Sequence, residues 1–178
     1  MSPRPYTKAA MALHWGHALV IGALVVIGLS MVDLPKGPER TAAYALHKSL
    51  GLVAFGLVAL RLAWRLRCPP PAHTGIDARE RRLANIAHRL LYLLLVLVPA
   101  TGFASICFTP YPLKFFGLPL PKPGWPDPEL NQFFSMLHLD ALVGLGILIL
   151  AHVAAALRHA WRRDGTLGRM LPGHYDAR

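Results

Sequence analysis

Residues 137–161 read LHLDALVGLGILILAHVAAALRHAW, and this run determines the predicted architecture. It is long and apolar enough to cross a bilayer as one helix. It also places His138 and His152 fourteen residues apart. At about 100° and about 1.5 Å per residue, fourteen steps return to within about 40° of the starting face and rise about 21 Å. The two imidazoles are therefore predicted to share one helix face, one near each side of the membrane. That spacing suits two stacked haems, whereas the alternative is one interfacial histidine and one packed in the bundle.

Three further apolar blocks resemble this one in length. The chain of 178 residues is 54% hydrophobic with a mean hydropathy of +0.39, and the blocks cover about 10–32, 47–66, 85–107 and 137–160. Each is close to the roughly 20 residues that a helix needs to span the hydrocarbon core. We therefore predict an all-α membrane protein, a single domain over 1–178 that forms an antiparallel four-transmembrane-helix bundle enclosing two b haems. The expected helices are about 9–32, 46–67, 85–107 and 137–161. The first is too long for a signal peptide and is expected to be retained.

The net charge of +10 predicts topology better than it predicts nucleic-acid binding. The N-terminus, the 61–89 connection and the C-terminal tail together carry fourteen Lys and Arg residues, whereas the opposite side carries five. By the positive-inside rule both termini are expected in the cytoplasm, with some attraction to anionic lipid. The five on the outer side are Lys36, Arg40, Lys48, Lys114 and Lys122.

The connections between the blocks are rich in proline. Residues 33–45 are expected to form the first outer loop, residues 68–84 the inner connection, and residues 108–135 a second outer loop. Seven prolines in 108–135 argue against regular structure there, and its aromatic and leucine residues suggest a lid over the bundle. Cys68 and Cys107 are expected at opposite sides, where they cannot pair. Because no C-x-x-C-H motif is present, any haem is expected to be held non-covalently.

Histidines recur at two depths in the predicted bundle. His47 and His138 fall at the outer ends of their helices, and His14 and His152 about two turns inside the inner surface. His17 and His88 are close to the inner level, and His73, His159 and His174 are at the inner edge or beyond. A low-spin b haem needs two imidazoles on opposite sides of one iron, and the set offers one such pair at each depth. A metal-ion transporter is less favoured, because no block has Asp or Glu near its midplane.

Two other features could serve a haem. Arg61 lies fourteen residues after His47, and its side chain either extends to the interface or pairs with a haem propionate. Gly16, Gly22 and Gly28 recur every six residues, where a neighbouring helix or a macrocycle could approach the backbone closely.

The chain resembles the bacterial cytochrome b561 family, particularly its four-helix superoxide oxidase (superoxide:quinone oxidoreductase) members. The resemblance covers nearly the whole chain. Its motifs are ALHW at 12–15, LHKSLG at 46–51, AHRLLYLLLVLVPATG at 87–102, and the run from His138 through AHVAAAL to RRDGTLGRMLP. It implies His14 and His152 as iron ligands of a cytoplasmic-side haem b, and His47 and His138 as those of a periplasmic-side one. It also implies a quinone site near the inner haem, with His88 and His159 as candidates. Lysines that some relatives carry in the inner connection are absent, and Arg79, Arg81 and Arg82 are the nearest cations.

The resemblance implies a multi-pass protein of the bacterial inner membrane that oxidises periplasmic superoxide and reduces ubiquinone. The outer lysines would attract the superoxide anion, and His88 or His159 would relay protons to the quinone. The main alternative is a cytochrome b subunit that takes electrons from a protein donor such as a hydrogenase or a soluble cytochrome. A haem-free transporter or membrane scaffold is a third class.

Overall fold

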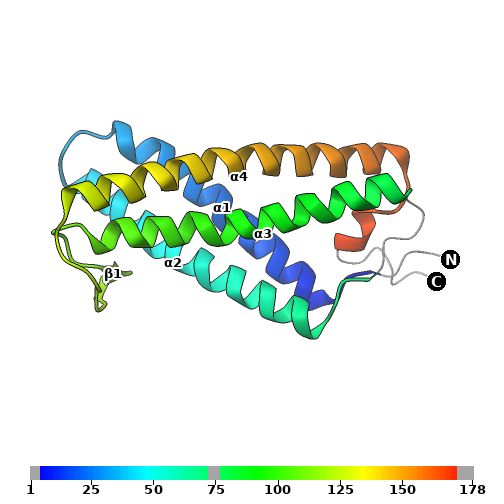
Figure 1. Cartoon of the computed structure of the whole chain (residues 1–178), viewed down its shortest axis with the longest axis horizontal. Coiled ribbons are helices and arrows are strands. Elements are labelled where there is room, and N and C mark those ends of the chain that lie inside the picture. Colours follow the sequence, from blue (N-terminus) through cyan, green and yellow to red (C-terminus); the bar gives the residue numbers. More distant parts are fainter. Residues whose placement is uncertain (1–4, 72–76, 172–178) are drawn as a thin grey trace.

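The computed structural model describes residues 5–71 and 77–171. The molecule has four long helices, of which two run along its long axis and two run obliquely to it (Figure 1). They are α1 (Lys8–Asp33), α2 (Pro38–Arg67), α3 (Ala78–Cys107) and α4 (Pro128–Arg162). All four contain an apolar window long enough to cross a membrane. The prediction of an all-α four-helix membrane bundle is confirmed. The positions of His73 and His174 lie outside the described residues.

Three of the helices begin earlier than the hydrophobic blocks predicted. α2 starts at Pro38 rather than about 46, α3 at Ala78 rather than about 85, and α4 at Pro128 rather than about 137. In each case a polar first turn precedes the apolar run. A side-chain cap supports the start of α3 and of α4, and a proline in the first turn supports the start of α2 and of α4. Asp77 accepts from Glu80 N at 2.7 Å, and Asp127 accepts from Leu130 N at 3.0 Å. Hydropathy marks where a helix meets lipid, not where it begins.

One end of the bundle, called here the hairpin end, is closed by a short two-stranded sheet. Strand β1 (Lys114–Phe115) pairs antiparallel with β2 (Leu118–Pro119), with positive φ at Phe116 and Gly117 in the turn. The amide of Phe116 donates to the buried Ser49 hydroxyl of α2 at 3.0 Å. The expectation of an irregular loop over 108–135 is therefore wrong in two respects. The hairpin occupies its centre, and α4 already begins at Pro128, because proline fits the first turn of a helix.

The opposite end, the tail end, brings together segments from both ends of the sequence. A short 3₁₀ helix, η1 (Leu167–Met170), lies beside the start of α1 (Figure 1). Tyr6 N donates to Arg169 O at 3.1 Å, and the Trp15 indole donates to Met170 O at 2.8 Å. The Arg169 guanidinium donates to Pro71 O at 2.7 Å. Residues near both termini are therefore fixed at the same end of the bundle.

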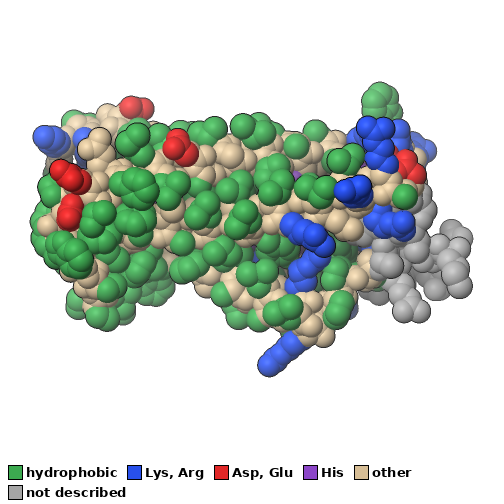
Figure 2. All heavy atoms as spheres, in the orientation of Figure 1, with side chains coloured by type: hydrophobic (Ala, Val, Ile, Leu, Met, Phe, Trp, Pro, Cys, Tyr) green, Lys and Arg blue, Asp and Glu red, His purple; other side chains and the backbone are tan. Residues whose placement is uncertain are grey.

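The packed centre of the bundle is small and its surface is apolar. Val58, Leu95 and Leu145, from α2, α3 and α4, form the buried cluster. Many large apolar side chains face outward instead, such as Leu19 at 75% exposure and Leu150 at 72%. Figure 2 shows apolar side chains over the length of the visible face and basic ones gathered at the tail end. An apolar surface of this extent suits a hydrocarbon environment rather than water.

Candidate functional site

Two histidines from α2 and α4 face each other at the hairpin end. The ring centroids of His47 and His138 are 6.5 Å apart with an interplanar angle of 87°. A histidine nitrogen lies about 2 Å from a transition metal and its ring centroid about 1.1 Å further on. Two imidazoles on opposite sides of one iron therefore have centroids about 6.3 Å apart. The hairpin-end pair has about the separation that two imidazoles holding one haem iron would need.

The surroundings of these two rings set their orientation. Nδ1 of His138 lies 2.7 Å from Val98 O, so it donates to that carbonyl and leaves Nε2 free as a ligand. The ring sits over Gly102, where an added Cβ would lie 3.0 Å from it. His47 is placed in the same way over Gly28, at 3.1 Å. Its Nδ1 is buried and has no hydrogen bond of normal geometry among the described residues, although a backbone carbonyl of α1 interacts with the ring. We call this close packing of an imidazole ring on a glycine a glycine cradle: Gly102 under His138 and Gly28 under His47. These two contacts are the part of the site that fits a haem ligand best.

The sequence indicated only part of this arrangement. Gly28 does permit a close approach by a neighbouring helix, as expected, and the group that approaches is the His47 ring of α2. Gly16 and Gly22 have open space where a Cβ would lie. The role of Gly102 was not predicted. The sequence does contain a repeated spacing that could have indicated it. Gly102 follows Val98 by four residues in α3, as Gly28 follows Leu24 in α1, and each pair contacts one histidine ring.

A second group of histidines lies toward the tail end. His14 of α1 and His152 of α4 have ring centroids 6.3 Å apart, at an interplanar angle of 59°. This separation also matches two ligands of one iron. His88 of α3 lies 5.7 Å from His152, close enough to make it a neighbour of the same site. No group of three or more His, Cys, Asp or Glu placed to hold a free metal ion occurs in residues 5–71 and 77–171. Paired imidazoles suit a haem, whose porphyrin supplies the other four ligands.

Arg61 of α2 occupies the centre of this tail-end cluster. Its guanidinium lies 3.2 Å from His14 Nδ1 and 3.4 Å from His17 Nδ1, and 5.4 Å from the Tyr92 ring centroid. Arginine only donates, so both Nδ1 atoms accept and the ring protons of His14 and His17 reside on Nε2. Iron binding by His14 Nε2 requires the opposite tautomer, with the proton on Nδ1. The tail-end pair has the separation to hold a haem, but His14 would need the other tautomer, without the contact to Arg61.

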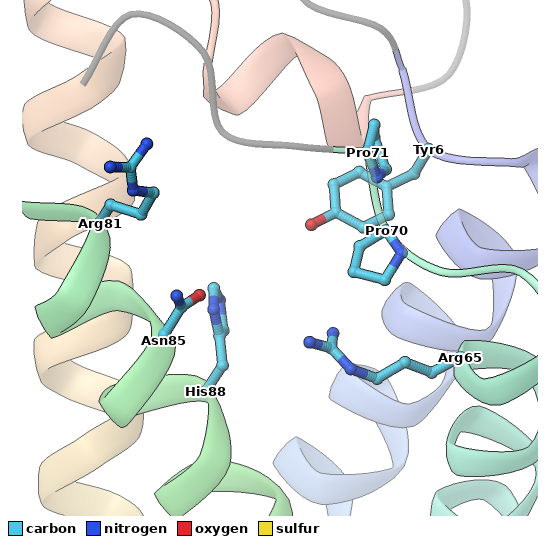
Figure 3. Close-up of a pocket in the computed structure, with 7 residues that line it drawn as sticks. All are labelled: Tyr6, Arg65, Pro70, Pro71, Arg81, Asn85 and His88. Carbon is cyan, nitrogen blue, oxygen red and sulfur yellow. The ribbon is translucent and has the colours of Figure 1, made fainter. Parts of the chain in front are cut away.

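A polar cavity of about 250 Å³ opens beside His88 at the tail end (Figure 3). Arg65 of α2 points into it from one side, and Asn85 and His88 of α3 point into it from the other (Figure 3). The Tyr6 hydroxyl and Arg81 complete its polar lining. Of the two histidines expected at a quinone site, His88 lines this cavity. The cavity was not predicted, although Asn85 lies one helical turn before His88 and that spacing places both on one face.

His159 is placed differently. Its Nδ1 donates to Asp164 Oδ2 at 2.5 Å, and it is not among the residues that line the cavity. Partial burial opposes ionisation of Asp164, but the hydrogen bonds from His159 and Thr166 outweigh it and lower the pKa of this carboxyl below its usual value. His159 therefore anchors the residues that follow α4.

Two lysines concentrate positive charge at the hairpin end. Lys48 follows His47, is half-buried, and lies close enough to Lys122 for the two ammonium groups to repel each other. Lys122 donates to the backbone carbonyls of Thr109 and Tyr111. Arg40 instead donates to Leu34 O at 3.3 Å, and Lys36 is exposed. Of the predicted outer cations, Lys48 directly follows a candidate ligand in the sequence, and Lys122 is the cation whose repulsion acts on Lys48.

Comparison with known proteins gives matches over nearly the whole chain. A sequence model described as prokaryotic cytochrome b561 matches residues 5–173. Cytochrome b561 homolog 2 of Escherichia coli (strain K12) is 30% identical over 180 residues, covering 96% of this chain and 93% of that protein. Cytochrome b561 homolog 1 of the same strain is 27% identical, covering 94% and 97%. A protein named probable superoxide oxidase CybB, of Yersinia pestis, is 27% identical, covering 95% and 97%.

Proposed function

Because the chain belongs to the prokaryotic cytochrome b561 family of membrane oxidoreductases, we propose that it is a di-haem b protein that oxidises superoxide and reduces ubiquinone. Membership of the family implies haem b, a bacterial membrane and an interaction with quinone. The proposal adds two haems, superoxide as the donor, and an orientation. The hairpin end faces the periplasm and both termini face the cytoplasm, because most Lys and Arg residues outside the spans lie toward the tail end.

The observation that carries the proposal is the pairing of imidazoles at two levels of one bundle. His47 and His138 would hold one haem and His14 and His152 the other, at centroid separations of 6.5 and 6.3 Å. When bound, the two haems would supply one-electron transfer between the two ends of the bundle. Spans α1, α2 and α4 supply the proposed ligands, and α3 packs beside them and helps to exclude water from the pathway between the two pairs.

On the periplasmic side, the residues next to His47 favour a small anion. Lys48 and Lys122 repel each other, so an anion between them would relieve that repulsion and be attracted from solution. Superoxide is such an anion, and a relative of this chain is named a probable superoxide oxidase. Each superoxide loses one electron and leaves as O₂. Two superoxide ions therefore supply the two electrons that convert one ubiquinone to ubiquinol.

On the cytoplasmic side, the 250 Å³ cavity is a suitable place for the quinone head group. The Tyr6 hydroxyl, the Asn85 amide and the Arg65 guanidinium provide donors for quinone carbonyl oxygens. His88 lines the cavity with its ring 5.7 Å from that of His152, so it lies between the proposed ligand and the quinone. Reduction to quinol takes up two protons, and His88 is the cavity residue suited to transfer them.

The test is steady-state reduction of a soluble ubiquinone by generated superoxide, using purified haem-loaded protein without a partner. Turnover is expected, and Lys48→Gln should lower the rate at low ionic strength by several-fold, with the difference shrinking as salt is added. Lys36→Gln is the matched control, because Lys36 is exposed in the connection between α1 and α2, and it should change the rate much less.

Two results would redirect the proposal. Haem-loaded protein without superoxide-dependent turnover would favour the alternative of a cytochrome b subunit with a protein donor, for which the exposed aromatics of the 108–127 connection, such as Trp125 at 62% exposure, offer a contact surface. A preparation without haem absorbance would favour a transporter or scaffold and contradict the whole assignment.

A further inference from the structure

A second hollow, of about 360 Å³, lies on the first turns of α3 at the tail end. Three arginines and an asparagine project around it from one helix: Arg81, Arg82, Asn85 and Arg89. Ala78 and Ile86 complete its lining. Arg81 and Asn85 also line the cavity proposed for the quinone, whereas Arg82, Ile86 and Arg89 do not. The hollow therefore adjoins that cavity and has two arginines of its own.

The arginines of this hollow have no acidic partner among the described residues. The nearest acids along α3 are already engaged. Glu80 pairs with Arg158 and with Arg162, and Asp77 caps the helix at 2.7 Å from Glu80 N. Unpaired guanidinium groups around one hollow form a binding site for an anion, and their planar donors match the oxygens of a phosphate.

An apolar stripe continues from the hollow along the same helix. Leu83, Ile86, Leu90 and Leu93 are spaced three and four residues apart, so they share one face of α3. Their side chains are 59%, 45%, 42% and 59% exposed. A ligand that satisfies both features carries a phosphate group at one end and hydrocarbon at the other.

We propose that this hollow binds the head group of an anionic phospholipid, whose acyl chains lie along the apolar stripe of α3. The position is suitable, because the hollow is at the end of a membrane span where phosphate groups of the bilayer lie. The lipid would be held by the guanidinium groups of Arg82 and Arg89, with Arg81 and Asn85 beside them.

The experiment uses haem-loaded protein in bilayer discs of phosphatidylcholine with or without phosphatidylglycerol, and native mass spectrometry counts the lipids retained. Phosphatidylglycerol should be retained in preference to phosphatidylcholine by about 25-fold, since Arg82 and Arg89 near the surface contribute about fivefold each. R82Q/R89Q should lose most of this preference. The matched control is R79Q/R163Q, which removes two charges at the same end from outside the hollow and should keep most of it.

Three results would overturn the proposal. Equal losses in the two double variants would show general attraction to the basic end. No preference for phosphatidylglycerol in the unmodified protein would show that no site exists. Displacement of the lipid by inorganic phosphate at equal concentration would show a free-phosphate site. If R82Q/R89Q yields no haem-loaded protein, the single changes Arg82→Gln and Arg89→Gln are measured instead. Each should lose several-fold of the preference, and failure of both to do so would overturn the proposal.

Discussion

The two histidine levels of the bundle differ in how far they are prepared for iron. At the hairpin end, His138 already has the tautomer of a ligand, because its Nδ1 donates to Val98 O at 2.7 Å. At the tail end, Arg61 donates to His14 and His17 and holds His14 in the other tautomer. Both levels have nearly the same ring separation, 6.5 and 6.3 Å. The two ring pairs therefore have similar separations, but only the hairpin-end pair is preorganised to bind iron, and the tail-end pair must first change the tautomer of His14.

The difference has a physical origin in what surrounds each ring. At the hairpin end a backbone carbonyl is the partner, and it can only accept, so the imidazole must present its proton. At the tail end a guanidinium is the partner, and it can only donate. A haem carries propionate groups, which are better partners for arginine than a neutral imidazole is. We therefore expect haem binding itself to draw Arg61 away from His14.

Loss of a ligand is the largest change that separates the two levels. His138→Ala should remove one haem, about half of the haem bound per protein, and spare most of the other, because the tail-end pair lies in other turns of the bundle. His152→Ala should remove the other half. Haem per protein, measured as pyridine haemochrome, and the α-band of the reduced protein report the result. If neither change lowers the haem content, the proposed ligand pairs are wrong.

The next largest effect is expected when the space between Gly102 and the His138 ring is filled by a methyl group. Gly102→Ala places a Cβ 3.0 Å from the His138 ring, tighter than ordinary contacts, so the ring must shift and its hydrogen bond to Val98 weaken. Overpacking of this kind costs about 1–3 kcal/mol, which corresponds to about 5- to 150-fold weaker haem binding at the hairpin end. Titration of haem into the apoprotein measures it.

The matched control for the cradle is Gly22→Ala in α1, where an added Cβ meets nothing within 4 Å. This change should leave both haems in place. Equal effects of the two alanines would mean that general helix packing, rather than the His138 cradle, is responsible.

Arg61 gives a smaller effect at the other level. Arg61→Gln removes the proposed propionate partner and also frees His14, so two opposing effects are combined. The charge-assisted pairing is the stronger, and tail-end haem binding should weaken by about fivefold while the hairpin-end haem is unchanged. Arg67→Gln, at the exposed end of α2, is the control and should change neither. Tighter haem binding in Arg61→Gln would show that Arg61 only competes for His14.

The sequence predicted the parts of this comparison that depend on regular helical spacing. Fourteen-residue spacing places His138 and His152 on one face, and hydropathy locates the spans. The depth of each histidine in the bundle, and from it the two ring pairs, could therefore be predicted. The neighbours of each ring could not be predicted. That Arg61 reaches His14 and His17 depends on how α1 and α2 pack, and no periodicity within one helix determines it.

The predicted starts of three helices were wrong, and the residues at those starts explain why. Hydropathy alone predicts loops at the polar turns that begin α2, α3 and α4, because it has no signal for a helix that continues into water. The positions of Pro38, Asp77 and Pro128 at the helix starts carried that information. Capping residues and prolines should therefore be considered together with hydropathy in a membrane protein.

The smallest expected effect concerns how the two ends are closed. The hairpin end is held by the neutral hydrogen bond from Phe116 N to Ser49, whereas the tail end is held in part by Asp164 and His159. Because the pKa of Asp164 is lowered in the folded protein, its contribution to stability is present above the ordinary carboxyl pKa of about 4 and is lost as the pH falls through the lowered value.

Hydrogen exchange of the tail-end segment around η1 (Leu167–Met170) should therefore accelerate below about pH 4, more than exchange of the hairpin does. Asp164→Asn should exchange faster at neutral pH and lose this extra acid dependence, whereas Ser49→Ala should loosen the hairpin at every pH. Acid also protonates the histidines proposed to bind haem, which would raise exchange in every protein. Comparing each variant with the unmodified protein at the same pH removes this shared contribution. Equal acid dependence of the tail in Asp164→Asn and the unmodified protein would show that other contacts, such as Arg169 with Pro71, close this end.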